Sequence, residues 1–174
     1  LVRYKRPELA IEAFNRLQKP LVVIGGGEML RELRAMAGPH VTMLGPQPFA
    51  VLKHHYARCQ ALIFPGEEDF GIVPVEAMAS GRPVIAYGKG GATETVQEGL
   101  TGTFFHEQSV EALIDAIERC KAIAPKPADL ISRASEFSVE RFTGAMTQFI
   151  DGVLNREDHG DRPAMAGGQL DLLH

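Results

Sequence analysis

Short apolar runs alternate with amphipathic stretches through most of this chain, and that alternation limits its fold more than any other feature. Several runs are flanked by Gly or Pro, as buried strands often are. The stretches between them carry apolar residues at helical spacing. Such alternation is typical of a parallel sheet covered by helices on both faces, so we predict an α/β, Rossmann-like fold. The expected strands span 21–24, 41–44, 61–64, 83–86 and 102–105, and the expected helices 7–17, 29–37, 49–59, 93–97 and 110–122.

The C-terminal part of the chain has a different pattern. Strand signals end near Pro127, and residues 129–134 and 139–154 predict two further helices, the second with Ser138 as its N-cap. The stretch after Asn155 is polar. We therefore expect one domain over residues 1–154 and a disordered tail over 155–174.

Composition excludes some classes of function. The chain has 174 residues, 45% hydrophobic and 23% charged, which is ordinary for a soluble globular protein. A net charge of −4 and the absence of Trp argue against a nucleic-acid partner. No apolar run approaches the roughly 20 residues of a transmembrane helix, and the first residues do not resemble a signal peptide. We expect Cys59 and Cys120 to be helical core residues, which suits a cytoplasmic protein.

The segment from Ala61 to Ala86 predicts a ligand site. An apolar strand leads into a loop that ends at Phe70-Gly71, and a helix with Pro74 in its first turn and Gly81 beyond its end follows. In a parallel sheet, such a loop and the start of its helix form the crevice that binds ligands. Free N–H groups there attract phosphate, and Gly71 allows close approach of a ligand to the backbone.

Two carboxylates in this segment have different expected roles. Glu68 lies in the loop, where it can accept hydrogen bonds from hexose hydroxyls. Seven residues separate Glu68 from Glu76, which lies in the expected first turn of the helix. Glu76 can accept two hydrogen bonds from a ribose diol. A purely structural alternative is that Glu76 complements the helix dipole and Glu68 is a solvated loop acid.

With these residues in view, roughly residues 1–154 resemble the C-terminal, donor-binding domain of family 4 (group 1) retaining GT-B glycosyltransferases. The resemblance implies an N-terminal, acceptor-binding domain that this chain lacks, and a strand and a Ser-Arg pair immediately before Leu1. Six ordered matches carry it: Lys5-Arg6, Val22–Gly27, Leu44-Gly45, Glu68–Glu76, Gly90–Val96 and Thr101–Phe105.

The resemblance implies transfer of a hexose from a nucleotide-diphosphate sugar to an acceptor hydroxyl, with retention at the anomeric carbon. It assigns catalytic roles to Glu68 and Lys5, with Lys5 binding the donor diphosphate. No cofactor is expected, and no metal, because the chain has no Asp-x-Asp and its adjacent His54 and His55 point to different helix faces. The expected substrate-binding residues are Gly25, Gly26, Gly45, Phe70, Gly71, Ile72, Val73, Glu76, Gly90 and Gly91.

The resemblance also suggests a donor and an acceptor. Segments 68–79 and 87–91 are similar to bacterial or archaeal mannosyltransferases that build surface polysaccharides, which favours GDP-mannose over a UDP-hexose. Such enzymes use glycan or lipid-linked acceptors, often at the inner membrane face, so we expect a cytoplasmic protein that is peripheral to that membrane.

Two other functions stay open. A GT-B-fold nucleotide-sugar epimerase would share the architecture but not usually the Glu68–Glu76 segment. A non-catalytic nucleotide-sugar binding module would need no acceptor domain. A dehydrogenase is disfavoured, because Gly25-Gly26-Gly27 is followed by Leu30 where a dinucleotide fingerprint has Gly or Ala.

Overall fold

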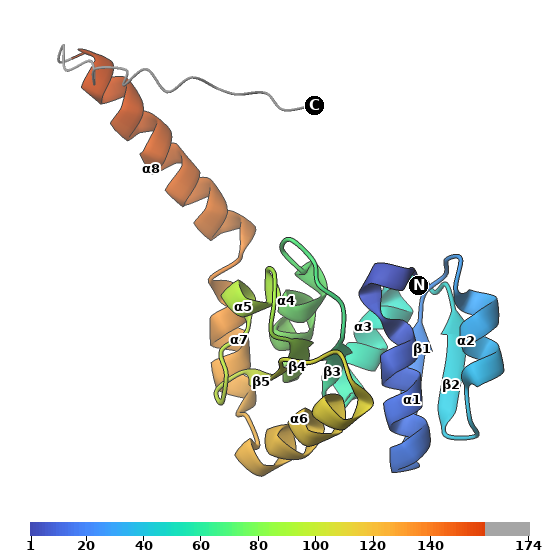
Figure 1. Cartoon of the computed structure of the whole chain (residues 1–174). Coiled ribbons are helices and arrows are strands. Elements are labelled where there is room, and N and C mark those ends of the chain that lie inside the picture. The colour runs from blue at the N-terminus through green and yellow to red at the C-terminus, as the bar shows by residue number, and fades with distance from the viewer. Residues whose placement is uncertain (159–174) are drawn as a thin grey trace, which may run out of the picture. The chain divides into compact units, whose positions relative to one another are not determined.

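The computed structural model describes residues 1–158 of the chain (Figure 1). It contains two compact units, the first formed by residues 1–137 and the second beginning at Ser138. The second unit contains the helix α8 (Val139–Asp158), which begins where the Ser138 hydroxyl accepts a hydrogen bond from the Arg141 N–H. This contact confirms Ser138 as an N-cap.

The first unit alternates strands with helices as the sequence predicts. Its strands are β1 (Leu21–Ile24), β2 (Val41–Gly45), β3 (Leu62–Phe64), β4 (Val84–Tyr87) and β5 (Gly102–Phe105). A short 3-10 helix, η1 (Arg3–Lys5), precedes the α-helices α1 (Pro7–Leu17), α2 (Leu30–Met36), α3 (Phe49–Arg58), α4 (Ile72–Ala79), α5 (Ala92–Thr95), α6 (Val110–Ile123) and α7 (Pro127–Ser135).

All strand pairs are parallel, as expected, but they form two ladders and not one continuous sheet. One ladder pairs β1 with β2, and the other has the order β3-β4-β5. Within residues 1–158, β1 and β3 are each paired on one side only. The same holds for β2 and β5, so each ladder has two open edges among these residues.

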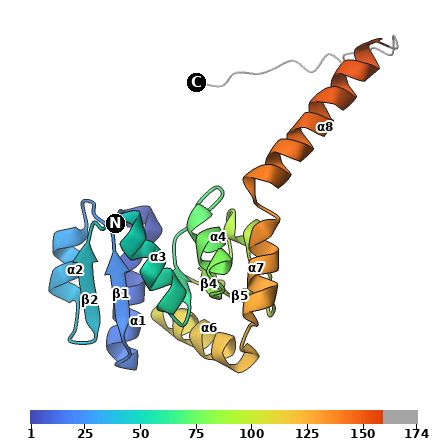
Figure 2. The ribbon, with the colours of Figure 1, turned by 180° about the vertical axis from the view of Figure 1, so that it is seen from behind.

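The first unit has two halves, one built on β1 and β2 and the other on β3, β4 and β5. Helix α1 connects them. It packs against α2 on one side and against α6 on the other (Figures 1 and 2). Leu9 and Ala13 of α1 are buried in one core cluster with Leu113 and Ile117 of α6. Burial of a side chain such as Leu113 stabilises the fold by about 1.5–3 kcal/mol, so this cluster is a main source of the contact between the halves.

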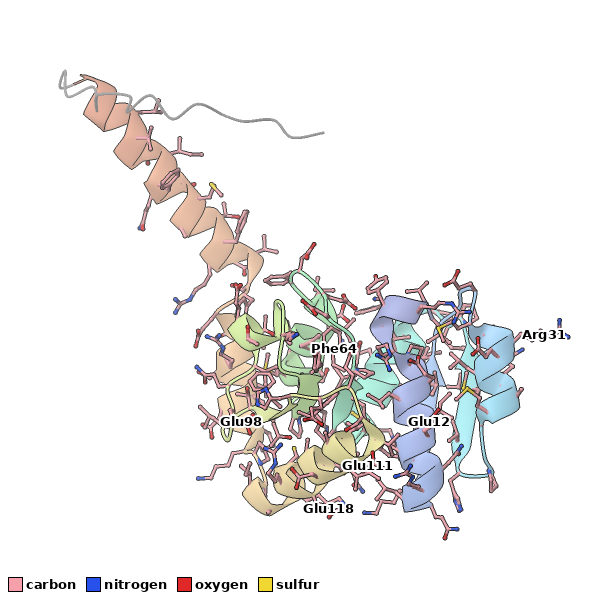
Figure 3. All side chains as sticks on the ribbon, viewed as in Figure 1. Glu12, Arg31, Phe64, Glu98, Glu111 and Glu118 are labelled. Atoms are coloured by element: carbon pink, nitrogen blue, oxygen red, sulfur yellow. The ribbon has the colours of Figure 1, made fainter. Side chains whose placement is uncertain are left out.

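Ion pairs border that apolar contact. Arg16 of α1 lies 2.5 Å from Glu111, and Lys19 lies 3.1 Å from Glu118. Figure 3 shows both glutamates on α6. Because all four side chains are solvent-exposed, water and salt weaken these attractions. The core residues therefore stabilise the contact between α1 and α6, and the ion pairs help to orient the two helices.

Three elements, at residues 7–17, 21–24 and 102–105, have the predicted bounds, and most others differ by one or two residues at an end. The predicted helix over residues 139–154 is longer in the structure, where α8 continues into the expected tail as far as Asp158. The remainder of the expected tail, residues 159–174, lies outside the described residues. The domain over residues 1–154 stays a prediction, and the first compact unit ends at Phe137.

Both cysteines are free thiols, but only Cys120 is the helical core residue that we expected, because Cys59 is half-buried and lies just outside its helix. Cys120 is buried in the core cluster of α6, and Cys59 follows the last residue of α3. Burial raises the pKa of both thiols above the ordinary value. A raised pKa reduces the thiolate fraction at neutral pH, which makes these side chains poor nucleophiles.

Candidate active site

The loop between β3 and α4 forms the centre of the candidate site. Strand β3 ends at the buried Phe64, labelled in Figure 3, and the loop from Pro65 leads to Gly71 at the N-cap of α4. Gly71 has a φ of 73°, and an added Cβ would lie 3.2 Å from the Phe64 ring. Glycine therefore suits the left-handed backbone conformation, and a side chain there would crowd the Phe64 ring.

A cavity of about 550 Å³ opens beside this loop. The loop lies on the same side of the first unit as the N-terminus, at its upper edge in Figure 1. Phe70, Gly71 and Ile72, which the sequence analysis assigned to substrate binding, line the cavity with Glu68. Three other lining residues, Tyr4, Glu67 and Asp69, were not among the predicted site residues.

An ion pair joins the two expected catalytic residues. The Lys5 Nζ lies 2.9 Å from the Glu68 Oε1, and the Glu68 side chain is 19% exposed. Hydrogen bonding to Glu68 raises the pKa of Lys5, against the opposing effect of burial. Lys5 is therefore protonated at neutral pH. Within residues 1–158, Oε1 is buried and has no hydrogen bond beyond this ion pair.

Close backbone packing at Gly66 brings η1 to the loop. An added Cβ at Gly66 would lie 2.6 Å from the Lys5 Cα and 2.9 Å from the Tyr4 carbonyl oxygen. Real Cβ contacts are longer than this, so a larger residue at Gly66 would displace η1. The sequence pattern gave no sign of this contact, because it joins segments that lie far apart in the chain.

A chain of hydrogen bonds also joins the residues next to η1 to the start of the loop. The Arg6 guanidinium donates to the Glu8 carboxylate at 2.6 Å and to the Gln108 Oε1 at 2.9 Å. The Gln108 Nε2 in turn donates to the Pro65 carbonyl oxygen at 3.0 Å. These bonds connect the residue after Lys5 to the start of the loop that carries Glu68, so they help to fix the spacing of the ion pair.

Gly90 and Gly91 support the loop from the other side. The Gly91 N–H donates to the Glu68 carbonyl oxygen at 2.7 Å. An added Cβ would overlap the Glu68 carbonyl oxygen at Gly90, and the Asp69 and Phe70 backbone at Gly91. Both glycines therefore shape the loop that holds the expected site residues.

Glu76 lies deeper in its helix than expected. Because α4 begins at Ile72, Glu76 belongs to the second turn, and no acidic residue occupies the first. The expectation of a first-turn carboxylate at Glu76 was wrong. Its Oε2 instead accepts a hydrogen bond of 3.1 Å from the Tyr56 hydroxyl of α3.

Three of the expected binding glycines lie in the β1–β2 half. Gly25 follows the last residue of β1, and Gly45 is the last residue of β2. The Gly25 N–H donates to the Gly45 carbonyl oxygen at 2.9 Å. The amino group of Leu1 donates to the Gly26 carbonyl oxygen. Gly25 and Gly26 therefore lie beside Leu1, at the start of the segment that leads to Lys5, but none of the three glycines lines the cavity. Val73 is partly buried against the core.

No cluster of three or more His, Cys, Asp or Glu side chains suited to a metal ion occurs in the part of the chain that the structure describes. No helix there is long and apolar enough to cross a membrane.

Comparison with known proteins agrees with this architecture. Anabaena HepE, solved in complex with UDP and glucose, is 26% identical, with a TM-score of 0.69 over 89% of this chain and 46% of that one. The fold is the α/β fold found in GT-B glycosyltransferases. Residues 1–137 match the family described as glycosyl transferases group 1, and the chain belongs to that family.

Two curated relatives have more specific names. A GDP-mannose-dependent alpha-(1-6)-phosphatidylinositol monomannoside mannosyltransferase of Mycobacterium tuberculosis is 38% identical over 122 residues, which are 60% of this chain and 32% of the relative. A D-inositol 3-phosphate glycosyltransferase of Mycobacterium leprae is 30% identical over 152 residues, 80% of this chain and 36% of the relative. The chain thus spans about a third of the length of these relatives.

Gly91→Ala tests the packing of the loop. The backbone of Gly91, with φ −61° and ψ −18°, suits alanine, so only the overlap with Asp69 and Phe70 should matter. We expect a loss of stability of about 1–3 kcal/mol, and faster amide hydrogen exchange in residues 68–72. Gly144→Ala is the control, because an added Cβ there meets nothing within 4 Å. Wild-type unfolding and exchange in Gly91→Ala would refute this role.

Proposed function

We propose that this chain is the donor-binding part of a retaining glycosyltransferase that transfers a hexose from a nucleotide-diphosphate sugar to an acceptor hydroxyl. The observation that carries the proposal is the Lys5–Glu68 ion pair of 2.9 Å beside the cavity at the start of α4. This arrangement provides one cation and one carboxylate within reach of the same ligand, together with the unpaired N–H groups of a helix N-terminus.

The diphosphate interacts with Lys5 and with the N-terminus of α4. Backbone N–H groups near Gly71 and Ile72 have no partner within the first helical turn, and the helix dipole favours an anion there. The ammonium of Lys5 exchanges its contact with Glu68 for phosphate oxygens. Negative charge grows on the diphosphate as its bond to the sugar breaks, so these donors stabilise the transition state more than the ground state.

Glu68 orients the hexose. Its carboxylate lines the cavity, and once Lys5 turns to the phosphates it can accept hydrogen bonds from sugar hydroxyls. The bond from the anomeric carbon to the diphosphate oxygen breaks, and a bond to the acceptor oxygen forms on the same face. The acceptor proton moves to the departing phosphate oxygen. This step requires no protein nucleophile.

GDP-mannose is the donor we favour. The Mycobacterium tuberculosis relative is named as GDP-mannose-dependent, at 38% identity, whereas the Anabaena structure contains UDP and glucose at 26% identity. The name of that relative also supports a lipid-linked acceptor. A glycan is the alternative acceptor, and a cytoplasmic protein working at the inner membrane face is the setting that we propose. A thermal-shift panel of nucleotide sugars ranks the donors directly.

Glu76→Ala tests the ribose contact. Removal of a charged hydrogen-bond acceptor costs about 1.5–3 kcal/mol, so affinity for GDP or UDP should fall by roughly 10- to 100-fold. Isothermal titration calorimetry measures this change. Glu12→Ala is the matched control, because Glu12 is an exposed glutamate of α1 (Figure 3). Unchanged nucleotide affinity in Glu76→Ala would show that Glu76 does not bind the ribose.

Glu68→Ala tests the sugar contact. We expect it to weaken binding of the nucleotide sugar by about 10-fold or more while affinity for the sugar-free nucleoside diphosphate changes much less. The comparison is internal, because both ligands contain the same base, ribose and diphosphate. Equal losses for the two ligands would contradict the assignment of Glu68 to the hexose.

A further inference from the structure

Tyr56 contacts a carboxylate of the proposed site. Its hydroxyl, on α3, donates to the Glu76 Oε2 at 3.1 Å across the contact between α3 and α4. The Tyr56 ring is partly buried against the core cluster that contains Phe64, Ala77 and Met78. The core therefore holds the ring in place, and the ring holds its hydroxyl at Glu76.

The phenol stays a hydrogen-bond donor under physiological conditions. Burial is the main cause that raises the pKa of Tyr56, and the charge of Glu76 raises it further. The Tyr56 hydroxyl therefore keeps its proton, whereas a carboxylate can only accept. The direction of the hydrogen bond is fixed, from Tyr56 to Glu76.

The two oxygens of Glu76 have different surroundings. Oε2 is occupied by Tyr56, while Oε1 accepts no hydrogen bond among the residues that the structure describes. A glutamate side chain has several rotatable bonds, and fixing them costs conformational entropy. A contact that restricts the carboxylate before a ligand arrives removes part of that cost from binding.

We infer that Tyr56 is a positioning residue: it fixes the Glu76 carboxylate so that the other oxygen is presented to the ribose diol of the donor. This inference rests on the proposed function, because it requires Glu76 to bind the ribose. Tyr56 itself does not touch the ligand. Its effect should therefore depend on the presence of both the Glu76 carboxylate and the ribose hydroxyls.

Tyr56→Phe in the full 174-residue chain tests the inference, because it removes only the hydroxyl. Calorimetry compares GDP and UDP with their 2′,3′-dideoxy analogues. We expect affinity for the ribonucleotides to fall by about 5- to 20-fold, and affinity for the dideoxy forms to change by less than about twofold. Tyr87→Phe is the matched control: it removes a phenol hydroxyl from the core cluster of α1 and α6 and should leave the ribose preference unchanged.

Glu76→Ala and the double variant Tyr56→Phe/Glu76→Ala complete the cycle. If Tyr56 acts through Glu76, the Tyr56 substitution has no further effect on ribose preference once Glu76 is alanine. The positioning role is wrong if Glu76→Ala abolishes the ribose preference but Tyr56→Phe keeps it. It is equally wrong if Tyr56→Phe lowers affinity for the ribose and dideoxy forms by the same factor. In both cases the proposed function stands. If Glu76→Ala keeps the ribose preference, or the wild-type chain binds neither nucleotide, the proposed function fails together with the inference.

Discussion

The structure of the candidate site depends on close backbone packing around one loop, the segment between β3 and α4. Gly66 allows η1 to lie against the start of the loop, and Gly91 donates a hydrogen bond of 2.7 Å to the Glu68 carbonyl oxygen on its other side. A side chain at either position would separate the segments. This packing helps to bring together Lys5 and Glu68, which come from segments far apart in the sequence.

This packing lets two opposite charges of the site neutralise each other. Lys5 and Glu68 are both charged and partly shielded from water, and each reduces the cost of burying the other. A donor that supplies a diphosphate and sugar hydroxyls would provide new partners for both at once. The ion pair therefore suits a site that exchanges an internal contact for two ligand contacts, with little unpaired charge in either state.

The sequence predicted local features well and long-range ones poorly. Periodicity located the strands and helices, and glycine and proline marked the ends of the loop that leads to α4, because these signals depend on neighbouring residues. The contact of Tyr56 with Glu76 and that of Arg6 with Gln108, 102 residues away, have no local signature. Glu76 lies in the second helical turn and not in the expected first one, because α4 begins at Ile72, two residues before Pro74.

The most decisive experiment is a crystal structure of the chain soaked with a nucleotide-diphosphate hexose. We expect the diphosphate between the Lys5 ammonium and the first N–H groups of α4, the hexose hydroxyls on Glu68 and the ribose diol on Glu76. We also expect the Lys5–Glu68 contact to be broken or lengthened in the complex. A donor bound elsewhere, with the ion pair still intact at 2.9 Å, would contradict the proposed function.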